Sequence, residues 1–319
     1  MRKLVQFAAG ALTGASTVLA LKSYPQYKED LRTAYQRIQT ESQTIETVVG
    51  PINYASTGEG LPVLLLHGAG GGYDQSLHTA PILGKGFQWI APSRFGYLGT
   101  ILPEDASPEA QADAYIALLD VLKIERIPVV GMSAGGPSAL QFALRHPERC
   151  SGLVMVAAVS FAMIDVASNP EVMEKIFDSL LFSDWLIWLG LQLAIHKIRP
   201  PLGVPAKIIQ QLNAADDAWL KTLLMYQLPV QPRRSGLVND LSQIYQLDIF
   251  PLEQINIPTL VIHAKDDSLV SIKHGRYTAE HIPQACLVEL PSGGHLLLGQ
   301  RIRVRTEVET FLRKAVQDQ

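Results

Sequence analysis

The sequence predicts an α/β fold with a mostly parallel sheet, helices on both of its faces and an inserted helical cap. Short apolar runs that suit fully buried strands recur along the chain, and helical patterns separate most of them. Strands that alternate with helices form mainly parallel sheets. The alternation stops between about residues 160 and 256, where helical patterns are broken by proline-rich segments, and it then resumes.

The predicted strands begin after residue 43. Between residues 44 and 55, apolar and β-branched residues broken by Gly50 and Pro51 indicate two short strands joined by a turn. Six further apolar runs indicate buried strands at residues 62–66, 87–91, 127–130, 153–157, 259–263 and 286–290.

Two of the predicted helices have clear signals. Ser107 is a good N-cap, Pro108 suits the first helical position, and the apolar residues after them share one face. Near the end of the chain, Val308 and Leu312 belong to a second apolar face. These helices would cover the predicted sheet.

The chain therefore divides into three parts. Residues 1–42 form an N-terminal hydrophobic segment and a linker helix, residues 43–160 and 256–319 form the α/β core, and residues 161–255 form the helical cap. A length of 319 residues fits one α/β core that carries such an insertion.

The N-terminal segment has the features of a membrane signal. Residues 4–21 carry no charge, follow Arg2 and Lys3, and are just long enough to span a bilayer. Two interpretations stay open: a retained anchor, favoured by Gly10 and Gly14 at G-x-x-x-G spacing, or a signal peptide. We expect a membrane-associated or exported protein, and basic residues on both sides of the segment leave its orientation open.

Charge and cysteine content exclude several kinds of site. With 27 basic and 30 acidic residues the net charge is -3, so the chain lacks the basic surface typical of a nucleic-acid binder. Cys150 and Cys286 lie far apart in apolar surroundings, where small buried thiols are common, and indicate neither a metal cluster nor a disulfide framework. We expect no nucleic-acid partner, no metal and no organic cofactor.

One turn carries a candidate nucleophile. The strand that ends at Val130 continues into Gly131-Met132-Ser133-Ala134-Gly135, and a helical stretch follows. A G-x-S-x-G sequence between a strand and a helix predicts a strained turn that exposes the serine hydroxyl. Because a serine hydroxyl is a poor nucleophile by itself, Ser133 needs a histidine base and an acid that orients the base.

The histidine is predicted from its position after the last strand. His295 lies in a glycine-rich loop directly after the strand that ends at Leu290. His274 and His281 lie on the preceding helical segment, where we expect them to be solvated. His263 ends a strand and is expected to be a core residue. We therefore predict His295 as the base.

The acid is expected just after the strand that ends near His263. Asp266 and Asp267 both lie there, and we choose Asp267, with Asp266 as a turn or capping residue. Asp165, which follows an earlier strand, is a rival acid in a less common position.

A glycine-rich loop at residues 66–72 is expected to help form an oxyanion hole. Its backbone can fold close to a ligand and supply one N–H donor, and the amide of Ala134 would supply the second. The loop lacks the G-K-[ST] ending of a nucleotide site. His67 is expected to be a structural support for the loop rather than a catalyst.

These motifs together resemble the α/β-hydrolase superfamily. The H-G loop, the G-x-S-x-G elbow, the D-D-x-x-V loop and the G-G-H loop occur in the family's order between residues 43 and 319. The resemblance implies an α/β-hydrolase fold with Ser133, Asp267 and His295 as the catalytic triad. It also implies that the backbone amides of Ala69 and Ala134 are the oxyanion donors.

Two further features refine this resemblance. Residues 92–97, which include Arg94, resemble the family's arginine-glycine loop, a structural feature near the entrance of the site. The nucleophile position holds Ser133 where dehalogenases and epoxide hydrolases of the superfamily have aspartate, which argues against both reactions.

The predicted function is hydrolysis of an apolar carboxylic ester through an acyl-enzyme, as in esterases and lipases. Residues 180–198 of the cap are rich in Leu, Ile and Trp and form either a lid over an apolar acyl pocket or a helix buried on the core. The alternatives are another acyl-transfer or C–C bond hydrolase with the same triad, or a hydrolase-like ligand receptor with little turnover.

Overall fold

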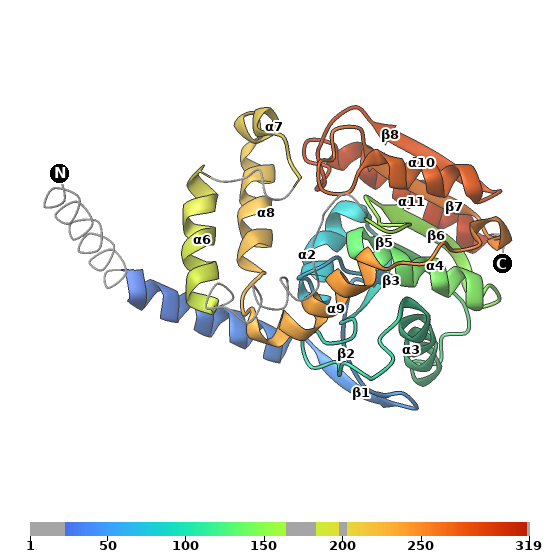
Figure 1. Ribbon diagram of the computed structural model, residues 1–319, viewed down its shortest axis with the longest axis horizontal. Helices are drawn as coiled ribbons and strands as arrows, with labels where there is room; N and C mark the ends of the chain where they lie inside the picture. The colour runs from blue at the N-terminus through green and yellow to red at the C-terminus, as the bar shows by residue number, and fades with distance from the viewer. Residues whose placement is uncertain (1–22, 164–182, 198–202, 318–319) are drawn as a thin grey trace, which may run out of the picture.

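An eight-stranded sheet forms the centre of the molecule. The computed structural model describes residues 23–163, 183–197 and 203–317, and the strand order is β1-β2-β4-β3-β5-β6-β7-β8 (Figure 1). Strand β2 pairs antiparallel with β1 and with β4, and the remaining pairs are parallel. The strands are β1 (Gln43–Thr47), β2 (Gly50–Thr57), β3 (Leu61–Leu66), β4 (Phe87–Pro92), β5 (Ile127–Met132), β6 (Cys150–Val156), β7 (Thr259–Ala264) and β8 (Ala285–Leu290).

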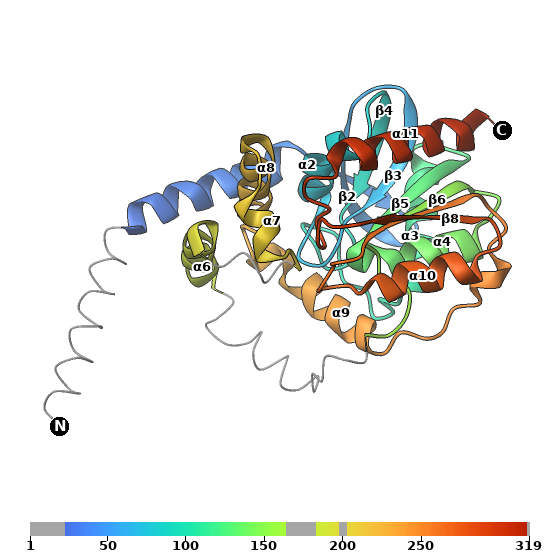
Figure 2. The same cartoon turned by 90° about the horizontal axis from the view of Figure 1, so that it is seen from above.

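Helices cover both faces of this sheet, as predicted. Helices α3, α4 and α10 pack on one face, and α2 and α11 pack on the other, so that α10 and α11 lie on opposite sides in Figure 2. The prediction of an α/β fold with a mostly parallel sheet is therefore confirmed. The helices are α2 (Tyr73–Leu83), α3 (Pro108–Val121), α4 (Gly136–Arg145), α10 (Ile272–His281) and α11 (Arg301–Gln317).

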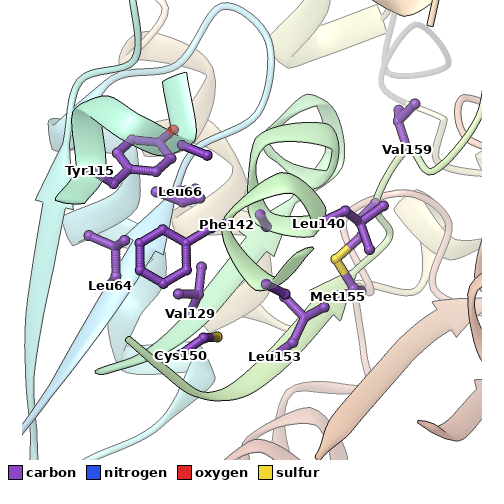
Figure 3. Packing of buried hydrophobic residues seen from close by; sticks show 14 of the residues in the cluster. Leu64, Leu66, Tyr115, Val129, Leu140, Phe142, Cys150, Leu153, Met155 and Val159 are labelled. Atoms are coloured by element: carbon purple, nitrogen blue, oxygen red, sulfur yellow. The ribbon is translucent and has the colours of Figure 1, made fainter. Parts of the chain in front are cut away.

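Burial on both faces explains the continuous apolar runs. Along β3, Leu64 and Leu66 face the core beneath α3 and α4, whereas Val63 and Leu65 face the core beneath α2 and α11. Figure 3 shows Tyr115 of α3 beside Leu64 and Leu66 in the first core. All six predicted parallel strands and the predicted hairpin are present. Ser107 caps α3 as expected, since its side chain accepts a hydrogen bond from the amide of Ala110.

A helical cap is inserted between β6 and β7. In Figure 1 its helices α6, α7 and α8 lie beside the carboxyl edge of the sheet, and α9 returns the chain to the core. The cap contains α6 (Asp184–Lys197), α7 (Ala206–Gln210), α8 (Ala214–Met225) and α9 (Arg234–Tyr245). Short turns are η1 (Ser133–Gly135) at the elbow, η4 (Gln231–Arg233) before α9 and η5 (Leu252–Gln254) before β7.

The helix predicted as a linker packs against this cap. It covers residues 23–40 and runs beside α6 and α8 in Figure 1. Ala34 is 2% exposed, the ring of Tyr27 meets that of Trp188 edge to face at 5.7 Å, and Asp30 accepts a hydrogen bond from Trp188 Nε1 at 2.7 Å. The predicted linker helix therefore packs on the cap, because Tyr27 and Ala34 belong to the same apolar cluster as Trp188 of α6.

The predicted membrane segment at residues 4–21 lies outside the described residues, so anchor or signal peptide stays a prediction. In the part of the chain that the structure describes, no helix combines the length and the apolarity needed to cross a bilayer.

Candidate active site

Ser133 sits in a tight turn between β5 and α4. Its φ of +49° lies in the left-handed region, which costs a non-glycine residue free energy. A Cβ atom on Gly131 would lie 2.6 Å from Cβ of Ala139, and one on Gly135 would lie 2.8 Å from the carbonyl oxygen of His67. The glycines of G-x-S-x-G are therefore required by close packing of the turn, as the motif predicts.

The structure brings the three predicted triad residues together at the carboxyl ends of the parallel strands. His295 Nε2 lies 2.9 Å from Ser133 Oγ, and His295 Nδ1 lies 2.8 Å from Asp267 Oδ2. The three residues come from the loops after β5, β7 and β8. Both distances are within ordinary hydrogen-bonding range, so a proton can pass from the serine to the histidine.

Asp267 is held as an acceptor by several donors. The amides of Leu269 and Val270 donate to its Oδ1 at 2.9 and 3.0 Å. Burial raises the pKa of the Asp267 carboxyl, but hydrogen bonds from His263 and His295 outweigh it and hold that pKa well below its usual range. The carboxylate is therefore ionised at neutral pH and can stabilise a positive charge on His295.

His263 is a further partner of the acid that the sequence interpretation did not assign. It is fully buried, as expected for a core residue, and its Nε2 donates to the carbonyl oxygen of Val270 at 2.8 Å and lies 3.3 Å from Asp267 Oδ2. The spacing of four residues between His263 and Asp267 was the available signal. This spacing does not by itself predict the contact, which depends on the bend in the chain after β7.

Asp266 supports the histidine loop instead of the histidine ring. Its Oδ1 accepts a hydrogen bond from the amide of Gly294, the residue before His295, at 2.9 Å. This contact agrees with the expected turn or capping role, although it joins two loops. The rival acid Asp165 lies outside the described residues.

The predicted oxyanion loop lies directly against the nucleophile. A Cβ atom on Gly68 would lie 2.9 Å from Cβ of Ser133, so only glycine allows this approach. Ala69 follows it and lines the cavity described below, and Ala134 is buried directly after Ser133. Gly68 therefore contacts the nucleophile, and the donor role of the Ala69 and Ala134 amides stays a prediction.

His67 supports this loop, as expected. Its Nδ1 donates to the carbonyl oxygen of Gly68 at 2.8 Å, and its Nε2 accepts from the amide of Arg94 at 3.0 Å. Burial and the Arg94 guanidinium lower the pKa of His67 well below its usual value, so the ring is neutral and one nitrogen can accept.

The Arg94 loop contacts the elbow, and none of its residues is among the described residues that line the cavity at the triad. The buried Arg94 guanidinium donates to the carbonyl oxygen of Ala134 at 3.2 Å and to both carboxylate oxygens of Asp240 in α9. Tyr97 donates its hydroxyl proton to Asp240 at 2.6 Å and accepts from the amide of Gly70 at 3.1 Å. This network joins the elbow and the oxyanion loop to the cap.

His274 and Cys286 differ from their predicted surroundings. His274 was expected to be solvated, but it is 4% exposed, stacks on Phe161 with ring centroids 3.8 Å apart, and accepts from the amide of Ser160 at 3.2 Å. It lies on the face of α10 that packs on the sheet. Cys150 is buried as expected, whereas Cys286 is exposed, because β8 is the edge strand of the sheet.

We predict that the buried histidines His67 and His274 lower the stability of the fold at acidic pH. Burial lowers the pKa of His274 to about 4, and that of His67 is lowered as well. As the pH falls from about 6.5 to about 4, the unfolded chain binds protons that the folded chain does not, so the free energy of unfolding falls. The part due to His274 is up to about 3 kcal/mol.

Urea unfolding between pH 7 and pH 4 checks this prediction. The variant His274→Gln should lose stability less steeply in this range than the unmodified protein does. His281→Gln, which removes an exposed histidine from the same helix, is the matched control. An unchanged slope in His274→Gln would contradict the prediction.

The triad opens into a mainly apolar cavity of about 200 Å³. Its wall comes from the oxyanion loop, α2, the elbow, α8, the histidine loop and α11. The cap contributes Trp219, Leu223, Leu224 and Gln227 of α8 and the residues just after it. Helix α6 contributes no described residue to the wall and packs on both residues 23–40 and α8. The described part of α6 therefore does not form the lid over the pocket that was one of the two interpretations of residues 180–198.

Comparison with known proteins agrees with this geometry. The model of the alpha/beta hydrolase fold family matches residues 62–301. The chain belongs to the α/β-hydrolase family. Within this family, it is 31% identical over 269 residues to the uncharacterized hydrolase YcgS of Bacillus subtilis, with 79% of this chain and 92% of that protein covered.

The chain is also similar to three further proteins. A 2-hydroxymuconate semialdehyde hydrolase from a Pseudomonas strain is 29% identical, with 76% of this chain and 83% of that protein covered. An α/β-hydrolase fold protein from Nakamurella multipartita has a TM-score of 0.69 and 32% identity, with 85% of this chain and 99% of that chain covered. An esterase from Thermogutta terrifontis shares the fold, with a TM-score of 0.67, 23% identity, and 86% of this chain and 99% of that chain covered. The protein is a hydrolase of the α/β fold.

Proposed function

We propose that the protein hydrolyses neutral carboxylic esters of apolar acids through an acyl-enzyme. The observation that carries this proposal is the Ser133–His295–Asp267 relay at the mouth of a cavity whose wall is mainly apolar. The same relay can serve several acyl-transfer reactions, and the cavity favours one class of substrate among them.

In the proposed reaction Ser133 Oγ attacks the ester carbonyl carbon while His295 Nε2 takes the hydroxyl proton. The carbonyl oxygen becomes an oxyanion, which the amides of Ala69 and Ala134 would stabilise. His295 then gives its proton to the departing alkoxide, and the acyl group remains on Ser133. Water, deprotonated by His295, attacks the acyl-enzyme, and the acid is released with Ser133 restored.

The charge of the cavity favours a neutral ester over the substrates of the C–C bond hydrolases. Several relatives are named as hydrolases of oxodienoates, which are carboxylates. Among the described residues that line the cavity there is no Lys or Arg, and burying an unpaired carboxylate is costly. A substrate with a charged acid group in this cavity would lack a partner.

A series of p-nitrophenyl esters tests the proposal. We expect kcat/KM to rise from acetate to hexanoate by about fourfold per methylene, because each buried methylene is worth about 0.8 kcal/mol while the pocket has room. The monoester of adipic acid with the same leaving group should be a poor substrate. A flat or falling series, or a preference for the adipate, would contradict the proposed substrate class.

A variant of the cavity wall tests whether this cavity selects the acyl chain. Leu223→Trp places a larger side chain in the wall contributed by α8 and should shorten the best acyl chain while acetate is still hydrolysed. Absence of turnover on every ester, with Ser133 still labelled by a fluorophosphonate, would favour the ligand-receptor alternative.

A further inference from the structure

We propose that the helix at residues 23–40 is a positioning element of the active site. Through Arg37 it holds the end of α8 and the start of α2 against the cavity, so that selection of the acyl chain depends on it. The substrate part of this inference rests on the proposed ester hydrolysis. The helix lies outside residues 62–301, the part that matches the family.

Arg37 joins the N-terminal helix to α2 and to the segment after α8, two elements that contribute residues to the cavity wall. Its Nε donates to Asp74 Oδ2 at 3.1 Å, and its Nη2 donates to the carbonyl oxygen of Leu228. Its guanidinium also lies over the ring of Tyr226, 3.9 Å from the centroid. Asp74 lies in the first turn of α2, whereas Tyr226 and Leu228 follow α8. One planar side chain therefore links elements that are far apart in the sequence.

Asp74 connects this contact to the oxyanion loop. It is fully buried and also accepts from Arg233, at 3.0 Å through Oδ1 and at 2.7 Å through Oδ2. Arg233 Nη1 donates in turn to the carbonyl oxygen of Gly71 at 2.7 Å. Removing Arg37 alone leaves the buried carboxylate paired with Arg233. The core should therefore still fold without the Arg37 side chain.

The segment that Arg37 holds is the part of the cap that faces the substrate. Gln75 Nε2 donates to the carbonyl oxygens of Tyr226 and Gly70, both at 3.3 Å. Gln75 and Gln227 line the cavity on either side of this contact. Tyr226 is thus fixed by Gln75 through its backbone and by Arg37 through its ring. A shift of Tyr226 would move Gln227 and the α8 wall.

The experiment compares Arg37→Ala with Arg32→Ala in the full chain. Arg32 lies on the same helix, is exposed and, among the residues that the structure describes, pairs with Glu29 one turn away. In Arg37→Ala we expect amide hydrogen exchange in residues 214–230 to be roughly ten- to a hundredfold faster, since hydrogen bonds to charged groups are lost, with exchange in β5 and β6 unchanged. The ratio of kcat/KM for hexanoate to that for acetate should fall roughly tenfold. Arg32→Ala should change neither quantity.

Arg37→Lys is the conservative variant. An ammonium group can reach Asp74 but cannot also donate to Leu228 and lie flat on Tyr226, so we expect it to recover less than half of the loss. Full recovery would contradict the role of the planar guanidinium.

Two results would overturn the proposal. One is an Arg37→Ala variant whose exchange matches that of Arg32→Ala. The other is faster exchange throughout the sheet as well as in α8, which would indicate general destabilisation. If the unmodified protein hydrolyses no ester, the proposed function fails, and the exchange data still decide whether Arg37 positions α8.

Discussion

Ser133→Ala is expected to abolish covalent labelling by a fluorophosphonate and to lower kcat on the preferred ester by on the order of 10⁴-fold or more. Ser133 Oγ is the atom that lies 2.9 Å from His295 Nε2, and alanine leaves nothing to attack the carbonyl carbon. The fold should survive, because alanine removes only the hydroxyl from a turn that glycines already accommodate. Labelling, steady-state kinetics and a thermal melt measure the three outcomes.

Ser268→Ala is the matched control for this experiment. Ser268 is exposed and directly follows Asp267, so it tests whether accessibility near the site is enough for labelling. We expect it to be labelled at the same rate as the unmodified protein. Labelling that persists in Ser133→Ala would mean that another residue is the nucleophile.

Asp267→Asn is expected to lower kcat by roughly 10³- to 10⁴-fold with little change in KM. The ionised carboxylate accepts the Nδ1 proton of His295 at 2.8 Å and so keeps Nε2 free to take the proton from Ser133. An amide in its place can donate to Nδ1 and favour the wrong tautomer. The kinetics of the preferred ester give the measurement.

Asp266→Asn is the neighbouring variant that separates the two aspartates. In the described part of the chain, Asp266 Oδ1 accepts the amide proton of Gly294, and an asparagine oxygen can accept the same bond. We expect a loss of less than about tenfold, of the size of one weakened hydrogen bond. If Asp266→Asn proved the more damaging variant, the role of acid would pass to Asp266.

Most of the core and the candidate triad could be predicted because the signals are local. A strand buried on both faces needs a continuous apolar run, and the elbow at Ser133 needs glycines within two residues. His295 and Asp267 follow the last strands directly, and parallel strands bring such loops to one edge of the sheet. Four short motifs in order were therefore enough to predict which side chains meet.

Contacts between distant segments could not be predicted in the same way. The burial of His274 depends on which face of α10 meets the sheet, and the exposure of Cys286 depends on the position of β8 at the edge of the sheet. Asp267 and His263 are close because the chain bends after β7. The apolar run of α6 indicated burial, but its partners are α8 and the helix at residues 23–40, which precedes it by more than a hundred residues.

The sequence by itself determined the α/β core, the order of its strands along the chain and the three residues of the candidate triad. The tertiary structure alone decided that α8 forms the substrate wall and that Arg37 and Arg233 share Asp74. The physical reason is the range of the interactions involved. Strand burial and turn conformation depend on neighbouring residues, whereas the cap is held by ion pairs and packing between segments whose separation along the chain leaves no periodic pattern.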